Sequence, residues 1–197
     1  MRKPPRSKAK ARPRVLASAP PRIAFPSSDA LMAAAREVEA KLSKPALVGG
    51  LAMQLYGSPR LTADVDIAAP GLPKGAKGKA LTFGGLRTKA SNGIEVDIIV
   101  RDDDYEELYK AACHHAIVID GLRVTTKEYL VILKMVAGRP KDEIDARFLC
   151  SLPEGQFDDR EAWKIAKHFL GPYGAGDFRQ LRSIAQWEKT QEKDNLK

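Results

Sequence analysis

Residues 46–70 read ALVGGLAMQLYGSPRLTADVDIAAP, and this stretch decides the fold. A short apolar run ends at a glycine pair, Gly49 and Gly50, and a second apolar run contains Asp64 and Asp66. Residues i and i+2 of a strand point to the same side, so the two carboxylates share one face. Two like charges in a strand of this kind are costly unless a cation neutralises them. The stretch therefore predicts a strand, a glycine turn into a short helix, and a second strand that presents paired carboxylates.

A third carboxylate is expected from the strand predicted at residues 94–100, IEVDIIV. Its alternation places Glu95 and Asp97 on one face and the aliphatic residues on the other. If this strand lies beside the one that carries Asp64 and Asp66, three carboxylates converge. Such a set binds Mg2+ through oxygen ligands and suits two-metal phosphoryl transfer. The alternative is that the aspartates lie on a solvent-facing strand surface.

The glycine pair and Arg60 are candidates for contact with phosphate groups. Glycines after a strand let backbone amides approach a phosphate, and the helix that follows favours negative charge at its start. A tight strand-to-helix turn is the alternative for Gly49 and Gly50. Arg60 reaches a phosphate or lies in an exposed turn.

Lys134 lies within YLVILKMVA, residues 129–137, a predicted helix that is apolar on almost all sides. A lysine in such a helix either extends its amine to solvent or meets an anion, for which a bound triphosphate is the candidate. Thr125 and Glu128 are expected to cap this helix. In the next helix, Asp142 is a candidate site residue; as an acid in a first helical turn, it also suits the helix dipole.

The layout along the chain predicts an α+β fold with three parts. Residues 1–27 are a basic, proline-rich tail, residues 28–125 an α/β core, and residues 126–190 a helical region with helices at 158–171 and 176–189. Residues 71–85 are expected to form an exposed loop with at most a short strand. The tail has no acidic residue and carries the whole net charge of +8. It is either a nucleic-acid-binding arm or a solvated leader.

Composition narrows the class of protein further. Hydrophobic residues make up 44% and charged residues 29% of the 197 residues, as in ordinary globular proteins. No apolar run approaches the roughly 20 residues of a membrane helix, so no membrane partner is expected. Two cysteines and three histidines lack the spacing of a zinc site or a disulfide framework. A cytoplasmic location is expected.

The motifs together resemble the DNA polymerase β-type nucleotidyltransferase superfamily. The matching pattern is the glycine pair, thirteen residues, Asp-x-Asp between apolar residues, and a later Asp in VDII. Residues 128–149, EYLVILKMVAGRPKDEIDARFL, are similar to the helical segment of its AbiEii-like toxin branch, in which Lys, Arg and Asp recur in that order. The likeness covers roughly residues 45–150. Gly50 departs from it, because many members have Ser there, and no further acid follows Asp66.

The resemblance implies a nucleotidyltransferase-type mixed sheet flanked by helices, an Mg2+ cofactor, and transfer of NMP from an NTP such as ATP to a hydroxyl. Asp64, Asp66 and Asp97 would be catalytic and metal-binding. The nucleotide would be held by Gly49, Gly50, Arg60, Lys134 and a downstream acid, Asp142 or Asp145. The acceptor would be RNA such as tRNA, within a toxin–antitoxin pair. The alternatives are modification of a partner protein and a catalytically silent member that binds nucleic acid.

Overall fold

The computed structural model describes residues 25–153 and 155–195, so most of the predicted basic tail lies outside the described residues. A single seven-stranded sheet has the order β3-β4-β5-β2-β1-β7-β6. Its strands pair antiparallel except for β2 with β5 and β1 with β7, which are parallel. The strands are β1 (Ala46–Leu47), β2 (Val65–Ala68), β3 (Lys79–Ala80), β4 (Gly85–Lys89), β5 (Glu95–Ile99), β6 (Ile117–Ile119) and β7 (Leu122–Val124).

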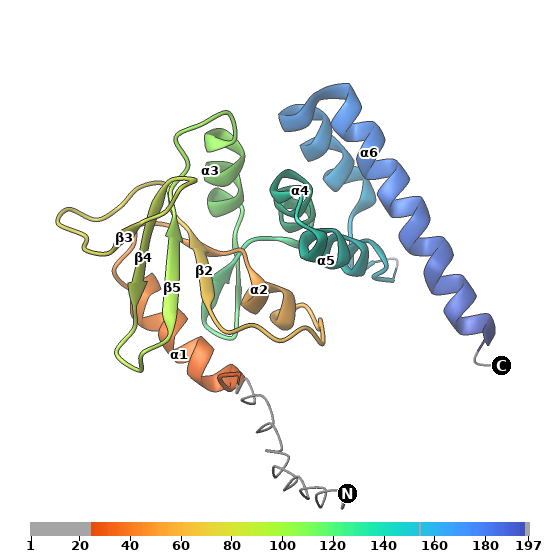
Figure 1. The fold of residues 1–197 in the computed structure, drawn as a ribbon. Coiled ribbons are helices and arrows are strands. Elements are labelled where there is room, and N and C mark those ends of the chain that lie inside the picture. The colour runs from red at the N-terminus through yellow and green to blue at the C-terminus, as the bar shows by residue number, and fades with distance from the viewer. Residues whose placement is uncertain (1–24, 154, 196–197) are drawn as a thin grey trace, which may run out of the picture.

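The helices fall into two groups around this sheet. The helices α1 (Ser28–Glu39), α2 (Gly50–Leu55) and α3 (Glu106–His114) belong to the sheet half of the chain. The helices α4 (Lys127–Ala137), α5 (Pro140–Cys150) and α6 (Asp159–Asn195) follow the last strand. Figure 1 shows α4 and α5 between the sheet and α6. The predicted fold class, a mixed sheet flanked by helices and followed by a C-terminal helical part, is confirmed.

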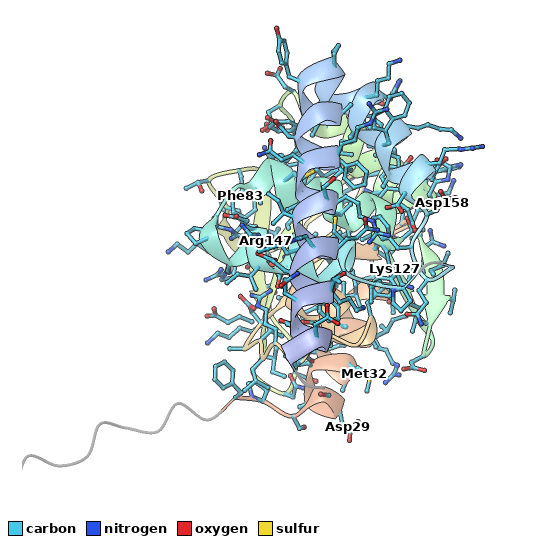
Figure 2. All side chains as sticks on the ribbon, turned by 90° about the vertical axis from the view of Figure 1, so that its right-hand side faces the viewer. Asp29, Met32, Phe83, Lys127, Arg147 and Asp158 are labelled. Atoms are coloured by element: carbon cyan, nitrogen blue, oxygen red, sulfur yellow. The ribbon has the colours of Figure 1, made fainter. Side chains whose placement is uncertain are left out.

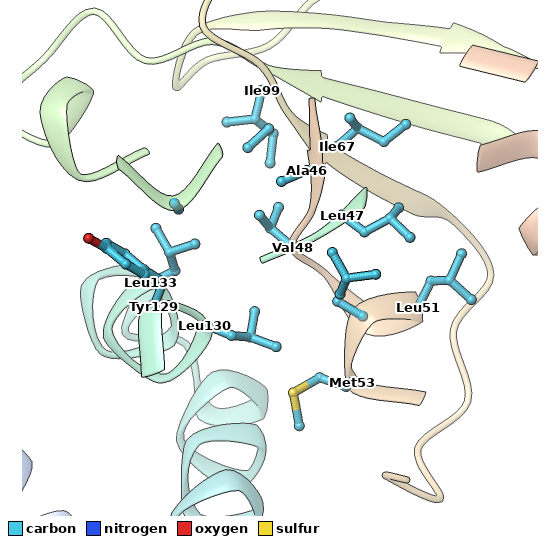
Figure 3. Close-up of a cluster of buried hydrophobic side chains, with 14 of the residues drawn as sticks. Ala46, Leu47, Val48, Leu51, Met53, Ile67, Ile99, Tyr129, Leu130 and Leu133 are labelled. Atoms are coloured by element: carbon cyan, nitrogen blue, oxygen red, sulfur yellow. The ribbon is translucent and has the colours of Figure 1, made fainter. Parts of the chain in front are cut away.

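A continuous hydrophobic cluster connects the sheet to α4. Val48, which follows β1, is buried together with Leu130 and Leu133 of α4. Figure 3 shows the two leucines on the side of α4 that faces Val48 and the residues of β1 and α2. Burial of each such side chain stabilises the fold by about 1.5–3 kcal/mol. This packing positions the helical part beside β1, next to the inner strands β2 and β5 that carry the aspartates.

Residues 71–84 form a loop with one short strand, β3, as predicted. The strand that was not predicted is β4, which begins at Gly85 and runs to Lys89 as the neighbour of β5. The high content of glycine and lysine hid this strand, because β4 has only one buried side chain, Leu86. Pairing with β5 along five residues, rather than intrinsic strand propensity, stabilises it.

Two helix boundaries also differ from expectation. The N-cap of α4 is Thr126, whose hydroxyl accepts a hydrogen bond from the backbone amide of Tyr129, and not Thr125. In α6, two helical stretches meet at Gly171, whose φ of 71° is left-handed, and Pro172 follows it. The second stretch runs to Asn195 along one face of the molecule (Figure 2), beyond the predicted end at residue 189. Among the described residues, no helix combines the length and apolarity needed to cross a bilayer.

Candidate nucleotide-binding cavity

A cavity of about 430 Å³ lies where the sheet meets α3, α4 and α5. Its volume is within the range of roughly 300–1,000 Å³ typical of small-molecule sites. All eight residues selected from the sequence line it: Gly49, Gly50, Arg60, Asp64, Asp66, Asp97, Lys134 and Asp142. The fold therefore brings these residues together from four separate stretches of sequence. Their individual roles stay predictions.

The strand carboxylates share one face of the sheet. β2 and β5 are parallel neighbours, and Asp66 and Asp97 are direct register partners. The predicted adjacency of the two strands is thus confirmed. Asp64 directly precedes β2 and accepts a hydrogen bond of 2.8 Å from the Thr62 hydroxyl. Thr62 is itself buried, so it holds the Asp64 carboxylate at the edge of the cavity.

Asp66 is the carboxylate in the least favourable electrostatic environment. Burial raises its pKa to about 6, and the negative charges of Asp64 and Asp97 add to this, while Lys134 opposes it. A pKa raised by burial and by neighbouring carboxylates means that the ionised form is short of compensating positive charge. This side of the cavity would gain stability from a bound cation.

Gly49 and Gly50 leave room for the side chains of Asp66 and Thr62. A Cβ atom on Gly49 would lie 1.7 Å from Oδ2 of Asp66, and one on Gly50 would lie 2.5 Å from Oγ1 of Thr62. Any larger residue at Gly49 would therefore displace the Asp66 carboxylate. A serine in place of Gly50, as in the superfamily that the sequence resembles, would collide with Thr62. The sequence suggested phosphate contact for this pair, and the packing supplies a second reason for it.

Arg87 of β4 is a site residue that the sequence analysis missed. It lies opposite Asp97 in the β4–β5 ladder and donates two hydrogen bonds, of 2.6 and 2.8 Å, to the Asp97 carboxylate. A second ion pair, of 3.2 Å, joins it to Glu95. Arg87 was missed because β4 was not predicted. With β4 recognised, its cross-strand position directly opposite Asp97 and diagonal to Glu95 would have identified it.

The three carboxylates meet the requirements of a metal ion only in part. Their oxygen donors are of the type that Mg2+ prefers, and the raised pKa of Asp66 fits a cation beside Asp64 and Asp66. Asp97 differs, because Arg87 already neutralises it. Across residues 25–153 and 155–195, no three His, Cys, Asp or Glu side chains are placed so that they could hold one metal ion. Asp64 and Asp66 fit a divalent ion, whereas Asp97 fits only after Arg87 moves away.

Lys134 meets anions, as one of its two predicted alternatives had it, but in the described structure these anions are protein carboxylates and not the predicted triphosphate. Its Nζ lies 3.1 Å from Oδ1 of Asp142 and 2.8 Å from Oδ2 of Asp145. All three side chains are buried. Burial alone would raise the pKa of Asp142, but Arg139 and Lys134 together hold it below its ordinary value. Asp142 and Asp145 are therefore the anions that allow a lysine inside α4.

Two arginines extend this group into an ion network between α4, α5 and the turn before β2. Nη1 of Arg60 lies 2.6 Å from Oδ2 of Asp145, and the guanidinium of Arg139 pairs with Asp142. Arg60 is thus not a freely exposed turn residue. The network contains three cations and two carboxylates, and exposed Lys141 of α5 adds a further positive charge to the cavity lining. The helical side of the cavity is therefore cationic.

Comparisons with known proteins do not assign a family to the chain. No protein-family model matches the chain, and no curated protein matches it. Among solved structures, the chain is similar to one described as a "putative nucleotidyltransferase from H. pylori". The two are 16% identical, the match covers 83% of this chain and 95% of that one, and the TM-score is 0.45. Any function has therefore to be inferred from the residues of the cavity.

Proposed function

We propose that the chain is an Mg2+-dependent nucleotidyltransferase that transfers NMP from an NTP to an acceptor hydroxyl. One observation carries the proposal: the same cavity is lined by Asp64, Asp66 and Asp97 of the strand side, by Lys134, Arg139 and Lys141 of the helical side, and by Gly49 and Gly50. An NTP–metal complex has the matching charges, because its metal is positive and its phosphates are negative.

The reaction is an in-line displacement at the α-phosphorus. The acceptor oxygen forms a bond to the α-phosphorus, the bond to the bridging oxygen of the β-phosphate breaks, and pyrophosphate leaves. A cavity carboxylate takes up the hydroxyl proton, and Asp97 is the candidate from the sequence. The positive charge that the network of Lys134, Arg60 and Arg139 carries in excess of its two carboxylates would orient the phosphates, so catalysis consists mainly of positioning and charge neutralisation.

Asp64 and Asp66 would hold the metal ion, and Asp97 would join them once Arg87 releases it. When bound, the ion supplies positive charge that stabilises the attacking and leaving oxygens. Gly49 keeps the Asp66 carboxylate in place for this task, since a side chain at that position would overlap it.

For the acceptor, we propose an RNA such as tRNA, modified by a toxin whose activity a cognate antitoxin restrains. The support is the resemblance of residues 128–149 to the helical segment of AbiEii-like toxins and the concentration of basic residues before residue 28. Basic side chains attract nucleic acid by displacing counterions from phosphates. Modification of a partner protein is the alternative acceptor chemistry.

A catalytically silent, nucleic-acid-binding protein is the second candidate, and one observation favours it. Arg87 neutralises Asp97 within the protein itself, with both oxygens of the carboxylate engaged. If that pair is permanent, the metal set lacks its third carboxylate.

The test is incubation of the protein with Mg2+ and each α-labelled NTP in turn, together with total RNA or lysate. The proposal expects label to appear on an RNA band with wild-type protein and to disappear with Asp66→Asn. Label on a protein band would identify the alternative acceptor. Tight RNA binding with no transfer from any NTP would favour the silent protein instead.

A further inference from the structure

Arg101 lies at the centre of an aromatic cluster on the rim of the cavity. It follows β5, the strand that carries Asp97, and its guanidinium carbon is 6.0 Å from the ring centre of Phe83, 5.7 Å from Tyr105 and 5.4 Å from Tyr109. Asp103 binds the guanidinium through two nitrogens. A guanidinium held between rings and a carboxylate has a fixed plane.

These side chains are not simply part of the hydrophobic core. Phe83, Arg101, Tyr105 and Tyr109 all line the same cavity as the carboxylates. Phe83 is 39% exposed although it is large and apolar, and the two tyrosines are half-buried. The rings come from the turn before β4 and from the start and middle of α3, so separate elements build the cluster. Aromatic surface gathered on the rim of a charged cavity marks a place where a flat, partly apolar group binds.

The position of the cluster completes a three-part lining. The aromatic cluster comes from the turn before β4, the start of α3 and the residues that follow β5. The carboxylates come from β2, the residue before it, and β5, and the cations come mainly from α4 and the start of α5. A nucleotide has three corresponding parts, which are a flat base, a metal-binding region and a chain of phosphates. Bases stack on aromatic rings and on the planar guanidinium of arginine, and such stacking has little preference for one base over another.

We infer that Phe83, Arg101 and Tyr109 form a stacking platform for a nucleobase. The inference rests on the proposed function and names the part of the cavity that would recognise its substrate. The base belongs either to the donor NTP or to the acceptor nucleotide beside the reacting hydroxyl. The chemistry is the same for both sources, and binding measurements separate them.

The experiment compares ligands with and without a base. Binding of ATP and of inorganic triphosphate is measured by calorimetry for the full chain, for Phe83→Ala, for Tyr109→Leu and for Tyr109→Phe. Loss of one stacking ring is expected to weaken ATP binding by about 5- to 150-fold and to leave triphosphate binding unchanged. Tyr109→Phe keeps the ring and should retain wild-type affinity. Tyr173→Ala, which removes an aromatic that is 89% exposed on α6, is the matched control.

A second ligand pair tests the acceptor as the source of the base. A short RNA with an intact 3′-terminal nucleotide is compared with the same RNA carrying an abasic 3′ end. If Phe83→Ala weakens binding of the intact RNA only and leaves ATP binding unchanged, the platform holds the acceptor base. Phe83 is exposed, so its substitution should not affect folding, and thermal denaturation checks the Tyr109 variants.

The outcomes separate the platform from the proposed function. If the wild-type protein binds ATP or RNA and neither Phe83→Ala nor Tyr109→Leu changes that binding, the platform does not exist. The proposed transfer reaction would still stand. A wild-type protein that binds neither any NTP nor RNA overturns both. If binding depends on the base as expected but no NMP is transferred, the platform is supported and the proposed reaction is overturned.

Discussion

The two sides of the cavity handle charge in opposite ways. On the helical side, Lys134 is enclosed by Asp142 and Asp145, and these three side chains are buried. Partly exposed Arg60 and exposed Arg139 complete the network. On the strand side, Asp66 lies near two further carboxylates, and its pKa rises to about 6. The helical side contains carboxylates that balance its buried lysine, whereas the strand side has too few positive charges for its carboxylates.

This difference indicates which part of the cavity holds the fold together and which part awaits a ligand. An ion network with a buried centre, in which each charge has a partner, fixes the packing of α4 against α5. If one buried member is removed, the remaining buried charges lose their partner, and the protein is destabilised. Carboxylates that repel one another cost stability in the free protein and regain it when a cation binds. The predictions below test this division.

The largest expected effect is the loss of stability in Lys134→Met. The substitution removes the ammonium from between two buried carboxylates, so unfolding should become easier by about 3–5 kcal/mol. Urea denaturation measures the difference. Lys141→Met, which removes an exposed lysine from the same cavity, is the matched control and should stay within about 0.5 kcal/mol of wild type. Equal stability of the two variants would mean that the network contributes nothing to the fold.

A second prediction concerns the contact between Gly49 and Asp66. Gly49→Ala places a methyl group where the Asp66 carboxylate lies, so it should destabilise the protein by about 1–3 kcal/mol. In an Asp66→Ala background, the same substitution should cost less, because the two nearest colliding atoms, Oδ2 and Cγ, are gone and only Cβ, at 2.6 Å, remains. Thermal or urea unfolding of the four proteins in this cycle gives the coupling. Additive effects would show that the glycine serves another purpose.

Asp66→Asn should make the protein more stable at neutral pH, in contrast to Lys134→Met. The folded pKa of Asp66, about 6, exceeds its ordinary value of 3.8, so the folded state binds more protons between these values. Stability therefore falls as pH rises from about 4 to about 6 and stays lower above that range. The variant should lack this fall and gain about 1–2 kcal/mol at pH 7. Urea midpoints from pH 4 to 8 check the sign, and a less stable variant at pH 7 contradicts it.

The last prediction concerns metal affinity, for which the smallest change is expected. Arg87→Met leaves the buried Asp97 carboxylate without its partner, which costs stability in the metal-free protein. Without Arg87, the buried Asp97 carboxylate is free to join Asp64 and Asp66, so the affinity for Mn2+ or Mg2+ should rise. Calorimetric titration of the two ions measures the change. Lys89→Met removes a charge from the exposed end of the same strand and serves as control. Unchanged or weaker affinity in Arg87→Met would assign Asp97 to a structural ion pair.

Sequence patterns were most informative where one local rule determines the geometry. The alternation around Asp66 and Asp97 predicted both strands and their shared face, because a strand has only two faces. The apolar period of α4 predicted a buried helix around Lys134. In both regions, short-range periodicity contains the relevant information.

The patterns failed where distant residues decide the outcome. Neither β4 nor the pairing of Arg87 with Asp97 is visible before β4 is placed beside β5. The partners of Lys134 are eight and eleven positions away on another helix, and Asp142 also satisfied a purely local explanation as a helix-start acid. The aromatic cluster around Arg101 is likewise assembled from separate elements. Such contacts follow from packing, which a single sequence does not encode in any one stretch.

The parallel pairing of β2 with β5 has a consequence for how chains of this kind diverge. Backbone hydrogen bonds between the two strands hold Asp66 level with Asp97, whatever the length of the chain between them. Residues 71–78, exposed throughout, can gain or lose residues at little cost, because loop-closure entropy changes slowly with length. Distances counted along the chain between the second and third aspartates are therefore free to drift. Alignments of such proteins should be anchored on strand register, not on motif spacing.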